Sequence, residues 1–259
     1  MNGKKYGLTL AIKAARYEQI LFTDADCRPA GKNWAAEMTS AFSDQTNFVL
    51  GHSMYTETKG MLNRFIRYET WWTAIHYMSA ALGGHPYMGT GRNLAYRKSV
   101  FLENKGFRGF GHIVGGDDDL FINRYARGKR TAVVLSEDSF TFSEPKKTWG
   151  EFFIQKLRHL SVGRYYRPTT RFTLGVLSLS HIFGLLLTLV LLAVPGGVYW
   201  AIGGYLLRTL LLHITLDKTG RKLKADIPLG WTSLMDWMYV VYYLITGLSA
   251  TFTKRIRWK

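Results

Sequence analysis

Residues 20–29 read ILFTDADCRP, an apolar run that ends abruptly on Asp24 and Asp26. The preceding residues 7–17 carry apolar side chains at helical spacing, which predicts a helix directly before a strand. This order is typical of parallel α/β sheets, whose ligands bind at the carboxyl ends of the strands. The stretch therefore predicts an α/β fold with both aspartates at the ligand-binding edge, after a strand that pairs in parallel.

Two interpretations of this pair of aspartates remain open. Where a strand gives way to a loop, both carboxylates can turn toward one cation, and Mg²⁺ or Mn²⁺ prefers such oxygen ligands. The plainer interpretation is a turn that begins with Asp and is aided by Pro29. For three residues taken alone, we favour the turn.

Apolar residues make up 47% of the 259 residues, and they are unevenly spread. The chain is mixed and charged up to Arg171, whereas three long apolar stretches follow it. A bilayer span needs about 20 apolar residues. We expect a globular domain over residues 1–171, a hairpin of two membrane spans over residues 172–216, and a basic loop, a third membrane or interfacial helix and a basic tail over residues 217–259.

The formal net charge of +16 narrows the choice of partners. It is compatible with an anionic membrane surface, a phosphorylated ligand or a nucleic acid. Because membrane-like segments are present, the membrane is the better explanation and no nucleic-acid partner is expected. The basic loop at residues 217–226 would share the cytoplasmic side with the globular part of a multi-pass inner-membrane protein. The single Cys27 excludes an internal disulfide and a multi-cysteine zinc site.

A second acidic cluster, GDDDL, occupies residues 116–120 at the end of a Gly-rich loop. Three consecutive carboxylates repel one another and raise at least one pKa unless a cation or a basic group is near. A solvated loop and a cap on the following helix are the plain alternatives to a chemical site.

Two further segments are weak signals when taken singly. Residues 89–99, GTGRNLAYRKS, place glycines before a helix but lack the spacing of a nucleotide fingerprint. Gln155 and Arg158 share one face of a basic amphipathic helix over residues 148–167. An arginine there can grip phosphate through two hydrogen bonds, although a basic face beside a membrane is usually solvated or lipid-facing. The other patterns predict helices at residues 33–43, 61–82 and 121–128, a short helix from Lys98, and strands within residues 47–56 and 130–142.

Taken in order, these motifs are more specific. GKKYGLTLAIKAA, FTDADCRP, GTGRNLAYRKSVF, GGDDDLF and QKLRH before membrane-like spans resemble the membrane-attached family 2 glycosyltransferases. The resemblance implies a Rossmann-like GT-A fold that binds a nucleotide-sugar, with Asp24 and Asp26 holding Mg²⁺ or Mn²⁺ on its diphosphate. It implies a general base at Asp117, with Asp118 as the near alternative and Asp119 in support. The donor- and acceptor-binding residues that it implies are Gly89, Gly91, Arg92, Asn93, Asp119, Gln155 and Arg158.

The activity implied by the resemblance is metal-dependent transfer of a sugar from a nucleotide-sugar, of the UDP type, to a lipid or saccharide acceptor. Direct displacement at the anomeric carbon needs a base for the acceptor hydroxyl and a cation for the leaving diphosphate. One carboxylate base with inversion of configuration is the expected outcome. His159 stands where the family motif has a tryptophan that is associated with polymer-forming members, which argues against a long polymer.

Two other functions stay open at this point. Family members begin with a strand upstream of the helix at which this sequence starts, so we expect a partial catalytic domain that lacks its first strands. The chain would then be a fragment, and a non-catalytic membrane-bound remnant or subunit is the main alternative. A Gly-Asp-Asp turn with high positive charge also describes a nucleotidyl polymerase, against which the membrane spans argue.

Overall fold

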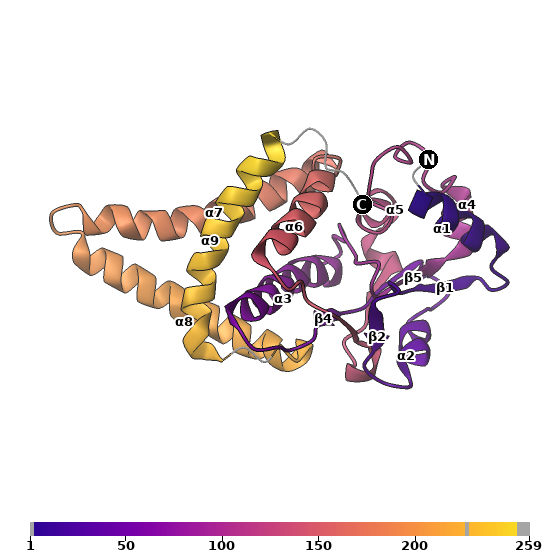
Figure 1. The fold of residues 1–259 in the computed structure, drawn as a ribbon, viewed down its shortest axis with the longest axis horizontal. Helices are drawn as coiled ribbons and strands as arrows, with labels where there is room; N and C mark the ends of the chain where they lie inside the picture. Colours follow the sequence, from indigo (N-terminus) through magenta and orange to yellow (C-terminus); the bar gives the residue numbers. More distant parts are fainter. Residues whose placement is uncertain (1–2, 226–227, 253–259) are drawn as a thin grey trace.

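The computed structural model describes residues 3–225 and 228–252 and shows a mixed α/β fold (Figure 1). A four-stranded sheet has the order β1-β5-β3-β6, and a three-stranded sheet has the order β2-β7-β4. The strands are β1 (Gln19–Phe22), β2 (Cys27–Pro29), β3 (Phe48–Leu50), β4 (Ser53–Tyr55), β5 (Leu94–Arg97), β6 (Thr131–Val133) and β7 (Thr141–Ser143).

The larger sheet differs from the predicted parallel one in a single strand. β5 runs antiparallel to both β1 and β3, whereas β3 and β6 are parallel. The prediction of a parallel partner for β1 is therefore wrong: within the described residues β1 pairs with β5, and Ile20 lies opposite Tyr96. The segment LAYR was interpreted as part of a Gly-rich approach to a helix, but its pairing with β1 and β3 makes it a strand. Because β1, β3 and β6 run in one direction, their carboxyl ends still share one edge.

Helices surround the sheets and continue to the end of the described chain (Figure 1). Except for α8, which continues past the predicted end at residue 216, they agree with the predicted helices to within a few residues at their ends. Their bounds are α1 (Gly3–Ala14), α2 (Trp34–Ser40), α3 (Met61–Leu82), α4 (Lys98–Glu103), α5 (Asp119–Tyr125), α6 (Trp149–Gly163), α7 (Pro168–Leu192), α8 (Val198–Leu223) and α9 (Leu229–Phe252), with short 3₁₀ turns η1 (Gly128–Arg130) and η2 (Glu137–Ser139).

A cluster of buried aromatic rings fixes the start of α5 against the larger sheet. Phe121 packs on Phe48, Tyr96 and Phe101, with ring centroids 5.9, 4.9 and 5.6 Å away. Such aromatic pairs contribute about 0.5–1.5 kcal/mol each beyond the area that they bury. Since Phe121 lies two residues after Asp119, this packing holds the acidic loop at a fixed place beside the sheet.

The carboxyl-terminal helices form a hairpin, α7 and α8, that extends away from the sheets, and α9 crosses it near α3 and α6 (Figure 1). Of the helices within residues 3–225 and 228–252, α7 is the one that is long and apolar enough to cross a membrane, with a mean hydropathy of 2.2. The expected two-span hairpin thus has one candidate span in the described chain, and the crossings by α8 and α9 stay predictions.

The basic segment after residue 216 is helical as far as Leu223, so the prediction of a loop there is wrong. Asp217 pairs with Arg221 at 2.8 Å one turn later, a spacing that supports a helix. Lys224 Nζ then lies 2.8 Å from Glu137 Oε1 of the globular part. The end of α8 is therefore docked on the sheet-containing part of the molecule.

Candidate functional site

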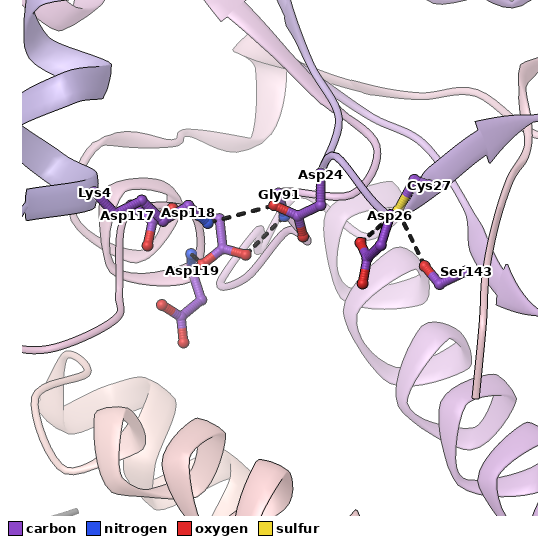
Figure 2. A network of polar contacts seen from close by, with 9 residues as sticks. All are labelled: Lys4, Asp24, Asp26, Cys27, Gly91, Asp117, Asp118, Asp119 and Ser143. Atoms are coloured by element: carbon purple, nitrogen blue, oxygen red, sulfur yellow. Dashed lines mark hydrogen bonds and ion pairs between the residues drawn. The ribbon is translucent and has the colours of Figure 1, made fainter. Parts of the chain in front are cut away.

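A cavity of about 1350 Å³ lies where the carboxyl end of β1, the loop before β5, the acidic loop before α5, and helices α3 and α6 meet. We call it the central cavity. Figure 2 shows Asp117, Asp118 and Asp119 on one side and Asp24 and Asp26 on the other, with Gly91 between them. The site residues predicted from the sequence that line the central cavity are Asp24, Asp26, Gly89, Gly91, Arg92, Asp117, Asp118, Asp119, Gln155 and Arg158.

Lys4 links the two acidic motifs. Its Nζ lies 2.8 Å from Asp117 Oδ2 and 3.4 Å from Asp24 Oδ1 (Figure 2). Enclosure by protein opposes the charge on Lys4, but the attraction and hydrogen bond of Asp117, with Asp24 and Asp118, raise its pKa above the ordinary value. Lys4 is therefore a cation at neutral pH. The sequence analysis of the motifs missed it, because nothing local connects a residue of α1 to acids 20 and 113 positions away.

The adjacent Lys5 fixes the approach to the acidic loop. Its side chain is buried, and Nζ donates to the backbone oxygens of Phe110 and Ile113, both at 2.8 Å. It also lies over the Phe110 ring, 5.0 Å from the centroid. Burial lowers the pKa of Lys5, although the three nearby aspartates oppose that change. Lys5 thus holds the segment before the acidic loop, and Lys4 contacts Asp117 in the loop itself.

Asp118 is tied to the backbone on both sides of its carboxyl group. Oδ2 accepts from Gly91 N at 2.7 Å, and Oδ1 accepts from Asp119 N at 2.8 Å, which caps α5. Desolvation and the neighbouring Asp117 raise the pKa of Asp118 to about 6. A Cβ on Gly91 would lie 3.3 Å from Asp118 Oδ2, so the glycine permits this close approach. Asp118 therefore joins the Gly-rich loop to the acidic loop.

Asp119 faces a tyrosine. Tyr166 OH donates to its Oδ2 at 2.7 Å, and Leu120 N donates to its Oδ1 at 2.7 Å. Desolvation and Asp118 raise the pKa of Asp119 to about 8, so this carboxyl is largely neutral at pH 7. Asp117, by contrast, contacts the flexible end of Lys4. The assignment of a general base among the three acids stays a prediction.

The DAD segment forms the turn that one sequence interpretation predicts, and the metal-ligand interpretation stays a prediction. Cys27 N donates to Asp24 O at 3.0 Å, which closes a turn over residues 24–27. The two carboxylates nevertheless line the central cavity. Within residues 3–225 and 228–252, no three His, Cys, Asp or Glu side chains converge on a common metal position. A pair of carboxylates is compatible with Mg²⁺, which usually keeps several waters and takes further ligands from substrate phosphates.

Basic and polar side chains form the part of the cavity wall nearest β4 and β7. The Arg92 guanidinium lies over the Tyr55 ring, 4.6 Å from its centroid, and Nη1 donates to Ser143 Oγ at 3.3 Å. Gln155 Nε2 donates to Tyr55 OH at 3.3 Å. Arg158 lines the same cavity one helical turn further along α6. Arginine is suited to phosphate oxygens because its planar fork can donate two hydrogen bonds together.

Asn93 is not among the residues that line the cavity, unlike its neighbours Gly91 and Arg92. It is fully buried, and its Nδ2 donates to His52 O and Ser139 O, both at 2.7 Å. Its Oδ1 accepts from Trp34 Nε1 at 3.0 Å. Asn93 thus connects three segments, and its implied role in binding stays a prediction.

Comparison with known proteins gives the family. The family described as "Glycosyl transferase family group 2" matches residues 20–251, a span that includes both acidic motifs, the sheets and most of α9. The chain belongs to this family. A search of curated proteins gives no match. Membership supports glycosyl transfer as the class of reaction and leaves the nucleotidyl polymerase alternative without support.

The link through Lys4 yields a prediction for Lys4→Met. Removing a cation from beside Asp24 is expected to lower the Mg²⁺ concentration needed for half-maximal donor hydrolysis by about 1.5- to fivefold, because an exposed ion pair contributes about 0.2–1 kcal/mol. Lys13→Met, an exposed lysine at the other end of α1, is the matched control. A Mg²⁺ titration of each variant measures the effect. A higher Mg²⁺ requirement in Lys4→Met would show instead that Lys4 supports the metal-bound complex.

Proposed function

We propose that this protein transfers a sugar from a nucleotide-sugar, of the UDP type, to a hydroxyl group of a lipid or saccharide acceptor, with Mg²⁺ or Mn²⁺ and inversion at the anomeric carbon. One observation carries the proposal: residues 24, 26, 92, 117 and 158, which are far apart in sequence, line a single cavity. Carboxylates lie at one end and guanidinium groups line another wall. This distribution of charge fits a donor diphosphate that is shared between a cation and arginines.

The donor would lie across the end of the cavity at β1. Asp24 and Asp26 would hold the divalent cation, and Arg92 and Arg158 would donate hydrogen bonds to the diphosphate oxygens. A bound Mg²⁺ or Mn²⁺ supplies charge neutralisation for the diphosphate as it leaves. Gly91 lines the same cavity, and its lack of a side chain lets the Asp118 carboxylate approach its backbone.

The acceptor would be activated by Asp117. Its carboxylate takes the proton from the acceptor hydroxyl while that oxygen attacks the anomeric carbon and the bond to the diphosphate oxygen breaks. Lys4 holds the carboxylate in place, since its Nζ is 2.8 Å from Asp117 Oδ2. Asp118 and Asp119 keep the loop in position through their backbone and Tyr166 contacts. A single displacement of this kind inverts the configuration of the sugar.

The proposal includes attachment to the cell inner membrane, with α7 crossing it, α8 returning and the globular part in the cytoplasm. Large apolar side chains are exposed along the hairpin, and Phe172, Leu187 and Leu206 are 74%, 56% and 61% exposed. Soluble monomers rarely leave extended apolar surfaces uncovered. Lipid is the environment that such helices favour.

Metal-dependent donor hydrolysis tests the proposal. The full chain is incubated with UDP-glucose, UDP-galactose and UDP-N-acetylglucosamine, and released UDP is measured before and after chelation of divalent cations. Chelation is expected to abolish UDP release, and added Mg²⁺ or Mn²⁺ should restore it. Asp24→Asn is expected to raise the required metal concentration by at least about 10- to 100-fold, the cost of losing even an outer-shell metal contact.

Asp44→Asn is the matched control for Asp24→Asn, because Asp44 is an exposed acid in the loop after α2 and does not line the cavity. It should behave like the unaltered chain. Metal-independent UDP release, or an unchanged metal requirement in both Asp24→Asn and Asp26→Asn, would contradict the assignment of these two residues as metal ligands.

A further inference from the structure

Positive charge is concentrated where α7 leaves the sheet-containing part of the molecule. Residues 120–136, which include most of α5 and the turn after it, contain four Lys or Arg residues and no Asp or Glu. Residues 152–216, which run from α6 through α7 into α8, contain no Asp or Glu either. The arginines of these two segments therefore lack acidic neighbours along the chain.

A buried asparagine brings two of these arginines together. Asn123 Nδ2 donates to Tyr87 O at 3.0 Å and to Thr170 Oγ1 at 3.3 Å. Its Oδ1 accepts from the backbone nitrogen of Arg167 at 2.8 Å. Asn123 thus joins α5, the loop after α3 and the start of α7. Because Arg127 lies two residues after α5 and Arg167 lies one residue before α7, this junction places the two arginines near each other.

The two guanidinium groups have no counter-charge of their own. Arg167 Nη2 donates to Pro86 O at 3.2 Å. Arg127 Nη1 donates to the backbone oxygens of Ala126 and Arg124, at 2.8 and 3.1 Å. Burial lowers the pKa of Arg167, and the charge of Arg127 lowers it further. Within residues 3–225 and 228–252 neither arginine forms an ion pair with a carboxylate.

A ligand at the molecular surface can reach this pair. Arg127 is exposed, and Arg167 is half-buried. Two neighbouring cations repel each other, and an anion that contacts both removes that repulsion. The pair therefore favours a ligand with a negative charge.

Apolar side chains flank the pair of arginines. Leu82, the last residue of α3, is 65% exposed, and Phe172 of α7 is 74% exposed. The loop that follows Leu82 packs on the turn that contains Arg127, since a Cβ on Gly128 would overlap Gly84 O. α7 itself is long and apolar enough to cross a membrane. Cations and exposed hydrocarbon therefore occur together at one end of this candidate span.

This combination favours an anionic phospholipid over a soluble anion. Headgroup phosphates accept paired hydrogen bonds from guanidinium groups. Acyl chains would cover Phe172 and the apolar residues of α7 that follow it, whereas free phosphate or a nucleic acid would leave them uncovered. Each Lys or Arg beside the membrane strengthens attraction to anionic lipid by about fivefold.

We infer that Arg127 and Arg167 form a headgroup site for an anionic phospholipid, at the end of α7 that adjoins the sheets. The lipid phosphate lies between the two guanidinium groups, and the acyl chains run along α7 beside Phe172. Neither arginine is among the residues that line the central cavity. The site therefore goes beyond the proposed sugar transfer and shares with it only the placement of α7 in the membrane. A lipid bound there ties α5, which follows the acidic loop, to the bilayer surface.

Lipid binding to the full chain tests the site. The chain in a neutral detergent is titrated with phosphatidylglycerol or with phosphatidylcholine of the same acyl chains, and bound lipid is counted by native mass spectrometry. Phosphatidylglycerol is expected to bind about 10- to 25-fold more tightly, since two arginines contribute about fivefold each. Arg127→Gln and Arg167→Gln should each weaken its binding by about fivefold. Arg127→Lys, which keeps the charge, should retain most of it.

Arg28→Gln is the control, because Arg28 is an exposed arginine on β2. It should bind phosphatidylglycerol like the unaltered chain. Circular dichroism checks the fold of each variant, and Arg127→Gln decides alone if Arg167→Gln loses helix. The site is refuted if the two lipids bind alike, or if Arg127→Gln matches Arg28→Gln. It is also refuted if a large excess of inorganic phosphate displaces the lipid, which would indicate a site for a soluble anion. No step uses a nucleotide-sugar, so the result is independent of the proposed activity.

Discussion

Replacing Asp117 by Asn is expected to lower the rate of sugar transfer by about 10²- to 10⁴-fold, the contribution of a positioned general base. Asn has the shape of Asp and can still accept a hydrogen bond from Lys4 Nζ, which lies 2.8 Å from the Asp117 carboxylate. It cannot take up a proton from the acceptor. The loss should therefore appear in kcat, while binding of UDP, measured by calorimetry with Mg²⁺ present, stays close to that of the unaltered chain.

Asp119→Asn is the matched comparison two residues away. Desolvation and Asp118 raise the pKa of Asp119 to about 8, so its carboxyl is largely protonated at pH 7 and an amide resembles it in charge. The amide oxygen can still accept the hydrogen bond from Tyr166. We expect a far smaller loss of kcat than in Asp117→Asn. Retained transfer in Asp117→Asn together with a large loss in Asp118→Asn would move the general base to Asp118.

The helices could be predicted from sequence because their burial pattern is local. α3 begins and ends at the predicted residues, Met61 and Leu82, since an apolar face over 22 residues gives many repeats of the helical period. The strands have three or four residues each, too few for an alternating pattern to stand out. β5 was missed for that reason: LAYR is recognisable as a strand only when β1 and β3 are known to lie on either side of it.

The sequence allowed a prediction of which residues belong to the candidate site, but not of which of them contact one another. The resemblance of the ordered motifs to a known family singled out Asp24 and Asp117, and the structure brings both to one cavity. Lys4, which contacts the two of them, depends on how α1 packs and has no local signal. Asn93 shows the converse, because this motif residue joins His52, just before β4, to Ser139 of η2.

The carboxyl-terminal helices add a constraint that hydropathy alone does not reveal. Asp236 is an acidic residue in the middle of the apolar helix α9. In the structure it is 1% exposed, and its Oδ2 lies 2.5 Å from Arg208 Nη1. His181 Nε2 is 3.1 Å from Oδ1, and Tyr68 OH donates to the same oxygen at 3.4 Å. One carboxylate thus connects α7, α8, α9 and α3.

Replacing Asp236 by Ala is consequently expected to lower the free energy of unfolding by about 3–5 kcal/mol, because it leaves Arg208 enclosed without its counter-charge. Arg208 keeps 23% of its side chain exposed, which favours the lower end of that range. The double variant Asp236→Ala/Arg208→Leu should recover part of the loss, since apolar replacement of a whole buried pair is often close to neutral. Chemical unfolding in detergent, followed by circular dichroism, measures both effects.

Asp217→Ala is the control for this prediction, because the Asp217–Arg221 pair on α8 is exposed and spans one helical turn. Such a pair contributes about 0.3–0.5 kcal/mol. Equal free energies of unfolding for Asp236→Ala and Asp217→Ala would contradict the prediction. They would mean that apolar contacts alone hold the helices and that the Asp236 carboxylate adds no stability. A much larger loss of the free energy of unfolding in Asp236→Ala would show that this carboxylate holds the helices together. His181 and Arg208, which contact Asp236, also line the cavity. Loss of that carboxylate should then also weaken binding of any ligand that reaches these two residues.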